Sequence, residues 1–150
     1  MTIKAREVLE DCRGALAEMT DGVQGPVWRR RWITAVTLLR TVGNVLENVD
    51  RNRSVEIAGA IDTAYESLKN SKPNPAIYWE FIYGFRNQIL KQYNINAGQD
   101  VNINLGSEPI AVYSYPIING SFIGRDQREV IREAIEWWEE YLDSIDKEAS

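Results

Sequence analysis

The side chains of this chain that could do chemistry are mainly arginines, because the 150 residues include no histidine and only one cysteine. The lack of an imidazole excludes Ser-His-Asp and Cys-His catalysis and His-ligated metal sites. One cysteine cannot form an internal disulfide, so the sequence favours a reducing, cytoplasmic setting. We therefore sought candidate sites among guanidinium groups, carboxylates and aromatic rings.

Three consecutive arginines, Arg29, Arg30 and Arg31, form the first candidate. They follow Gly25-Pro26, which is typical of a helix start, where each exposed cation opposes the helix dipole at a cost of roughly 0.3–1 kcal/mol. This placement favours an anionic partner, either an RNA backbone or an acidic protein surface. The alternative is a solvated surface with ion pairs to acids on neighbouring helices.

Charge is also unevenly distributed along the chain. Residues 26–53 contain six arginines and two acids, a balance of +4, whereas residues 129–150 contain eight acids and two basic residues, a balance of −6. The two regions are expected to pair within the molecule or between two copies of it. The net charge of −5 disfavours tight nonspecific binding to nucleic acid, but a local basic patch can still hold RNA weakly.

The second candidate is Arg86-Asn87, on a predicted helix that continues to Tyr93. Helical spacing predicts that Arg86 and Tyr93 share one largely apolar face, where a guanidinium needs a partner. That partner is either an acid of the same chain, such as Glu47 or Asp50, or a phosphate bound in a cleft.

The segment Trp32 to Asp50, followed by Arg86-Asn87, resembles HEPN domains, the helical bundles of bacterial toxin–antitoxin and phage-defence systems. The resemblance implies a homodimer in which two Arg-Asn motifs meet in a cleft. In the family a histidine follows that arginine and completes a metal-independent ribonuclease; here its position falls on Lys91 or Tyr93. Lysine and tyrosine ordinarily have pKa values near about 10, far from the value a general base needs at neutral pH.

Other residues with possible chemistry have simpler explanations. Cys12 falls on the apolar stripe of the first predicted helix and is interpreted as a core residue. Trp137 and Trp138 lie on adjacent helix faces, so they are candidates for core packing or for an interface. Three acids could in principle ligate a metal, but an exposed acidic face explains them without one: Glu129, Glu133 and Glu136. We expect no metal and no cofactor.

The elements that position these residues follow from periodicity. Apolar residues at three- and four-residue spacings predict helices over about 2–20, 26–49, 54–70, 75–93 and 126–145. Thr2, Ser54 and Asp126 are expected to cap three of them, Asp126 in a capping box with Glu129. The period changes to two between 100 and 118, which predicts a β-hairpin that must pack on the helices or on a partner.

The sequence thus predicts an all-α fold: a single domain over 1–150, built as a bundle of about five helices with a β-hairpin inserted between helices four and five. No run is long enough to span a membrane, and the first residues are not typical of a signal peptide. The leading hypothesis is a noncatalytic, dimeric, HEPN-like binding or regulatory domain. The alternatives are a metal-independent ribonuclease that uses Arg86, Asn87, Lys91 and Tyr93, and a plain protein-interaction module.

Overall fold

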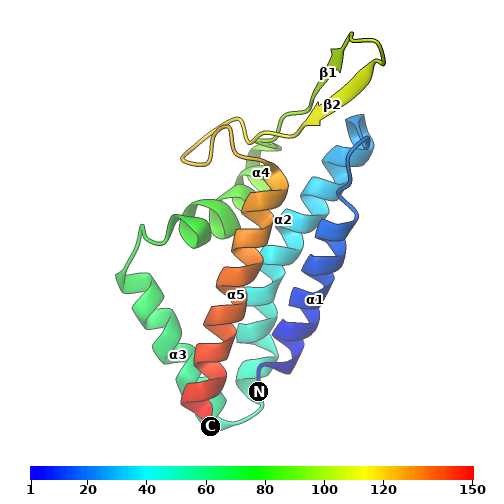
Figure 1. The fold of residues 1–150 in the computed structure, drawn as a ribbon. Coiled ribbons are helices and arrows are strands. Elements are labelled where there is room, and N and C mark those ends of the chain that lie inside the picture. Colours follow the sequence, from blue (N-terminus) through cyan, green and yellow to red (C-terminus); the bar gives the residue numbers. More distant parts are fainter.

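Three long helices form the body of the molecule in the computed structural model, which describes all residues 1–150. Helices α1 (Ile3–Ala17), α2 (Gly25–Asn48) and α5 (Gln127–Ala149) run side by side along the long axis (Figure 1). Helix α3 (Val55–Asn70) follows the short 3₁₀ turn η1 (Asp50–Asn52) and packs against α5. None of the helices combines the length and apolarity needed to cross a bilayer.

The predicted helices share one hydrophobic core of 33 buried residues. Helix α2 lies at its centre: Trp28, Trp32 and Leu39 are at most 1% exposed and face different neighbours. The indole of Trp28 donates to Gln127 at the start of α5 (2.9 Å), and that of Trp32 donates to the carbonyl of Ile95 (2.9 Å). Burying each such ring contributes roughly 1.5–3 kcal/mol, so the wide apolar surface of α2 fixes the bundle around it.

The helix starts are stabilised by local and by distant side chains. Ser54 caps α3 by accepting from the Ile57 amide (3.1 Å), as predicted, and Asp126 caps α5 through the Arg128 amide (2.8 Å) without a return bond from Glu129. Thr2, the expected cap of α1, is fully buried, and its side chain bonds to Asp146 instead.

Asp50, which lies just after the C-terminal end of α2, caps the N-terminus of α1 in place of Thr2. Its carboxylate is fully buried and accepts from the amides of Lys4 (3.0 Å) and Ala5 (2.8 Å). These amides have no partner inside the helix, and the positive end of the helix dipole favours a carboxylate there. The prediction that Thr2 caps α1 is therefore wrong, because a residue 46 positions from Lys4 reaches the same amides.

The fourth predicted helix is composed of two kinds of helix. Residues Ile77–Phe85 form a π-helix, η2, which continues directly into the α-helix α4 (Arg86–Gln92). Gly84 permits this looser winding, because a Cβ at that position would lie 3.2 Å from the carbonyl oxygen of Trp79. Helix α4 ends at Tyr93, which adopts a left-handed conformation with φ of 49°.

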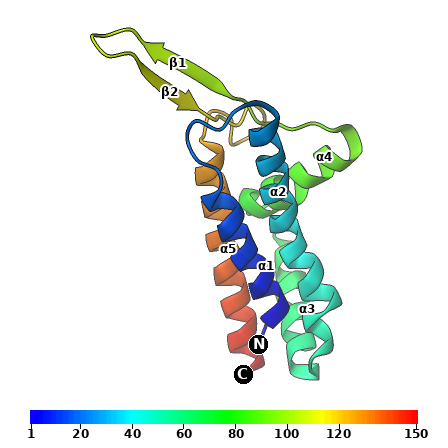
Figure 2. The ribbon, with the colours of Figure 1, turned by 90° about the vertical axis from the view of Figure 1, so that its right-hand side faces the viewer.

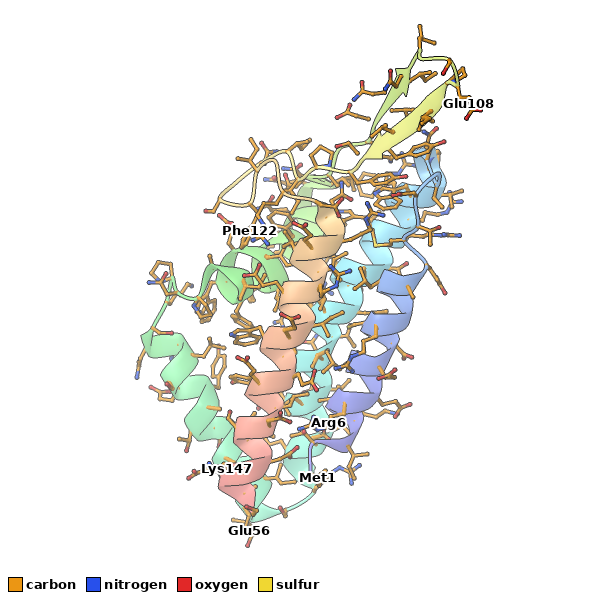
Figure 3. The ribbon with its side chains drawn as sticks, viewed as in Figure 1. Met1, Arg6, Glu56, Glu108, Phe122 and Lys147 are labelled. Carbon is orange, nitrogen blue, oxygen red and sulfur yellow. The ribbon has the colours of Figure 1, made fainter.

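The predicted hairpin forms, but apart from Tyr113 its strand residues are exposed rather than packed on the helices. Strands β1 (Asp100–Asn104) and β2 (Ile110–Ser114) pair antiparallel, with Asp100 opposite Ser114, and project from one end of the bundle (Figure 2). Glu108 marks its solvent-exposed tip (Figure 3). The second strand ends at Ser114, short of the predicted Ile118, because the chain then enters the core. Its connection to the bundle is both polar and apolar: Gln99 exchanges two hydrogen bonds with the backbone of Gly25 (2.7 and 3.1 Å), and Tyr115, directly after β2, stacks on Trp28.

Candidate anion-binding site

The arginines of this chain fall into two groups according to their partners. Six form ion pairs with acids of the chain: Arg6, Arg13, Arg51, Arg53, Arg125 and Arg128. The other six have no carboxylate within 4.0 Å, and five of these six are all the arginines of α2 and α4: Arg29, Arg30, Arg31, Arg40 and Arg86. The unpaired cations are therefore concentrated on two helices that pack against each other.

The arginine triplet lies in the first turns of α2, where the chain supplies no acid. The side chains of Arg29 and Arg30 are exposed and form no hydrogen bond, whereas the guanidinium of Arg31 donates to the backbone carbonyl of Glu18. The ion pairs to neighbouring helices that would explain this triplet as an ordinary surface are not formed.

The acidic helix α5 pairs with α1 rather than with α2. Arg6 bonds to Asp143 (2.7 Å) and Asp146 (2.8 Å), and Arg13 bonds to Glu139 (2.8 Å). The predicted attraction between the basic and acidic regions is thus not satisfied within one chain at the triplet. The positive charge of α2 remains available to another molecule.

Arg86 and Asn87 form the first turn of α4 and are both half-buried. Neither side chain hydrogen-bonds within the chain. The acids considered as partners of Arg86 are engaged elsewhere: Glu47 with Arg51 (3.6 Å) and Asp50 with Arg53 (3.0 Å). Arg86 is therefore not held by an acid of its own chain.

The remaining residues of the predicted motif lie apart from Arg86. Lys91 is exposed and, five residues later on an α-helix, projects about 140° away from Arg86. Tyr93 is 61% exposed and lies beyond the helix end, so the predicted shared face with Arg86 does not extend to it. Within one chain, the four candidate ribonuclease residues do not form a single site.

Helix α4 itself lies at the periphery of the molecule, and the segment after it is fixed by amides. Figure 2 shows α4 at the edge of the bundle, and Leu90, one turn after Arg86, is 62% exposed. The side-chain amide of Asn96, which is buried, donates to Gln88 and accepts from Asn119 (2.9 Å). The surface that carries Arg86 is thus both accessible and well anchored.

The tryptophan and cysteine candidates lie in or against the hydrophobic core. Trp138 is 2% exposed and donates to the Leu39 carbonyl (2.8 Å), while Trp137 is half-buried and stacks on Tyr141. Cys12 is fully buried, and burial raises the pKa of its thiol to about 12, so the thiol is unreactive at neutral pH. The candidate metal acids do not converge with other potential ligands.

Sequence reasoning missed a pocket around Arg40, between α2, α3, η2 and α5. It has a volume of about 360 Å³ and is lined by Tyr78, Tyr83 and Tyr141 among others. The Arg40 guanidinium lies 5.1 Å from the centre of the Tyr83 ring, and its Nε is buried with no hydrogen-bond partner. The available signal was an arginine in the middle of the predominantly apolar second helix.

Comparisons with known protein families, with curated proteins and with solved structures found no match for this chain. The arginines that the chain leaves unpaired are consequently the strongest indication of what it binds.

Proposed function

We propose that this protein is a noncatalytic binding domain of HEPN type that holds an anionic partner, RNA in the first instance, on Arg29, Arg30 and Arg31 of α2 and on Arg86 of α4. Two copies associate through α4, so that the Arg86-Asn87 pairs meet in a polar cleft. On the resemblance in Trp32 to Asp50 and at Arg86-Asn87, we propose a role in bacterial defence or in a toxin–antitoxin system, inside the cell.

One observation carries this proposal: these four arginines lack a carboxylate partner, although the chain has 22 acids and an overall charge of −5. Acids outnumber basic residues, so the absence of pairing here is not due to a shortage of carboxylates. Arginine is also the side chain whose planar donors best match phosphate oxygens.

A noncatalytic role is preferred to the ribonuclease alternative because the chain lacks a group suited to proton transfer beside Arg86. It has no histidine, and Lys91 and Tyr93 lie exposed and apart from Arg86. Arginine can stabilise a developing negative charge, but cleavage by the 2′-hydroxyl also needs a base.

The RNA-binding part is tested by replacing Arg29, Arg30 and Arg31 together with alanine. Binding of a fluorescein-labelled single-stranded 20-nucleotide RNA is measured by anisotropy at several salt concentrations. Each phosphate contact adds about 0.7 to the slope of log affinity against log salt, so loss of three contacts lowers the slope by about 2.

The matched control removes the same charge elsewhere: Lys69, Arg132 and Lys147, none of which forms an ion pair, are replaced with alanine. This control is expected to keep the wild-type salt slope. Equal salt slopes for the two triple variants would overturn the assignment of the triplet to RNA. Binding of an acidic protein but not of RNA would show that the triplet holds a protein partner instead.

The dimer is tested with Leu90→Asp, which places a charge on the exposed face of α4. Sedimentation velocity should show a dimer for the wild-type protein and a monomer for this variant. Leu105→Asp, a change at an 84% exposed leucine outside α4, should leave the dimer intact. A monomeric wild-type protein at 100 μM or so contradicts the α4 dimer, since a specific interface of ordinary affinity would be filled at that concentration.

The noncatalytic assignment is tested by incubating the protein with RNA in EDTA. We expect no cleavage by the wild-type protein. Cleavage that persists in EDTA and is lost in a folded Arg86→Ala variant would establish the ribonuclease instead.

A further inference from the structure

The pocket around Arg40 is separate from the arginines of the proposed RNA surface. Four elements build it: α2 contributes Arg40 and Asn44, α3 contributes Tyr65, η2 contributes Tyr78 and Tyr83, and α5 contributes Tyr141. Its volume of about 360 Å³ falls in the range of small-molecule sites.

Arg40 gives the pocket an uncompensated positive group. No carboxylate lies within ion-pair distance of it, and its Nε is shielded from solvent without any hydrogen-bond partner; in the described chain this is the only such buried side-chain atom. Guanidinium stays protonated at all physiological pH values, so it cannot avoid this cost by losing its charge. The terminal nitrogens of this guanidinium have no hydrogen-bond partner either and are not shielded, so an anion entering the pocket would bind them.

The π-helix gives the pocket two of its aromatic walls. Residues five apart on an α-helix project about 140° from each other, whereas the i to i+5 bonding of η2 brings them toward one side. Tyr78 and Tyr83, which are five apart, accordingly both line the pocket. Their rings, with Tyr141 and the edge of Trp138, present aromatic surface beside the guanidinium.

The tyrosine hydroxyls add donors that the protein itself does not use. Tyr115, which donates to the Val23 carbonyl (2.8 Å), is the one tyrosine whose hydroxyl hydrogen-bonds within the chain. Burial raises the pKa of Tyr78 and Tyr141 above the ordinary tyrosine value, although Arg40 opposes the rise at Tyr78. Both hydroxyls therefore remain protonated and able to donate to an anion or a ring atom.

The pocket also contains two acids, of which Glu47 lies seven residues after Arg40, about 10 Å further along α2. Glu47 and Asp62 line the pocket, and Arg51 bridges them at 3.6 and 2.8 Å. The pocket thus combines one unpaired guanidinium, several aromatic rings and two carboxylates that are paired with Arg51. A ligand that matches this lining carries an anionic group on a flat ring.

We propose that this pocket binds a small aromatic anion, a planar ring that bears a phosphate or a carboxylate, with the anionic group on Arg40 and the ring among Tyr78, Tyr83 and Tyr141. Phosphate and carboxylate are both recognised by guanidinium, so the two classes share this chemistry.

Isothermal titration calorimetry on the full chain tests the proposal with four probes: adenosine 5′-monophosphate, indole-3-acetate, neutral adenosine and inorganic phosphate. We expect one-to-one binding of at least one aromatic anion, at least tenfold tighter than binding of adenosine or phosphate. Binding of the nucleotide alone identifies the phosphate class, and binding of the indole acid alone identifies the carboxylate class. No binding of either anion, or equal binding of adenosine and its monophosphate, overturns the proposal.

Arg40→Met tests the position of the anion, and Arg132→Met is its matched control, because Arg132 is also unpaired but lies outside the pocket. Affinity should fall at least tenfold in the first variant and stay unchanged in the second. Urea unfolding should show Arg40→Met to be at least as stable as the wild type, whereas a purely structural arginine would lose stability.

Tyr83→Phe provides a second test, since Tyr83 is 37% exposed and its substitution leaves the ring in place. Loss of one hydroxyl donor should weaken binding several-fold with the fold intact. Unchanged affinity in both Arg40→Met and Tyr83→Phe would place the ligand elsewhere and refute the site.

Discussion

Asp50 shows how a single side chain joins distant parts of this fold. It ends the α2 region, accepts the first free amides of α1 and receives Arg53 at 3.0 Å, all with its carboxylate fully buried. A buried carboxylate is tolerated only where hydrogen bonds replace its lost water, and here three donors do so.

Replacing Asp50 with alanine should lower the free energy of unfolding by about 2–3 kcal/mol, because the helix loses its cap and the amides of Lys4 and Ala5 lose their acceptor. Urea unfolding measures this change. The control, Asp11→Ala, removes an exposed carboxylate of α1 that forms no ion pair, and should change stability by less than about 0.5 kcal/mol. Similar losses in both variants would show that Asp50 is not the cap.

Among the helices, two glycines have different surroundings: Gly14 lies on open surface and Gly43 lies at a contact between helices. Gly14 on α1 has no atom within 4 Å of the position of a Cβ, whereas a Cβ on Gly43 of α2 would lie 3.1 Å from the Trp138 ring. The close approach of α2 to α5 at Gly43 also brings the Trp138 ring to the edge of the Arg40 pocket.

Gly14→Ala should therefore raise the free energy of unfolding by about 0.5–1 kcal/mol, the usual gain of alanine over glycine in a helix interior. Gly43→Ala should give no gain or a loss, because the same methyl group must displace Trp138 or the Arg40 side chain, which lies 3.3 Å away. Thermal unfolding of the two variants tests the pair. Equal gains would contradict the tight α2–α5 contact.

Over the whole molecule, ion pairs join the two ends of the chain. Thr2 and Arg6 hold Asp146, and the Arg6–Asp146 distance is 2.8 Å. Burial tends to raise the pKa of Asp146, but the hydrogen bonds from Arg6 and Thr2 outweigh it, so the pKa lies below the ordinary 3.8. At Asp126, burial likewise tends to raise the pKa, but the hydrogen bonds from Arg128 outweigh it and lower the pKa.

A carboxylate whose folded-state pKa is lowered stabilises the fold above its unfolded pKa and loses this effect as the pH falls through the folded value. Stability should therefore be level near neutral pH and decline below about pH 4. Asp146→Asn should be less stable at pH 7 and show a shallower decline, so that the two proteins converge in acid.

The control for this profile is Glu148→Gln, a neighbouring exposed acid without an ion pair, which should follow the wild-type curve. Denaturant midpoints from pH 7 to pH 2 provide the measurement. A constant difference between wild type and Asp146→Asn at every pH would rule out the linkage.

Local patterns in the sequence determined which elements exist. The 3.6-residue period and the caps Ser54 and Asp126 predicted the five helices, because such a period reflects which face of a helix is buried. The alternation around Val101 predicted the hairpin, although β1 is exposed on both of its faces. The same information excluded histidine chemistry. It did not predict that η2 winds as a π-helix, which depends on the packing of that segment.

Only the tertiary structure decided which charges find partners. Asp50 reaches α1, and Asp146 bonds to Thr2 across 144 positions, whereas Arg86 and the triplet find no acid. The Arg40 pocket likewise needs side chains from four elements. A helical period records which residues lie on one face but not what packs opposite that face, so pairing and pockets are set by the three-dimensional arrangement.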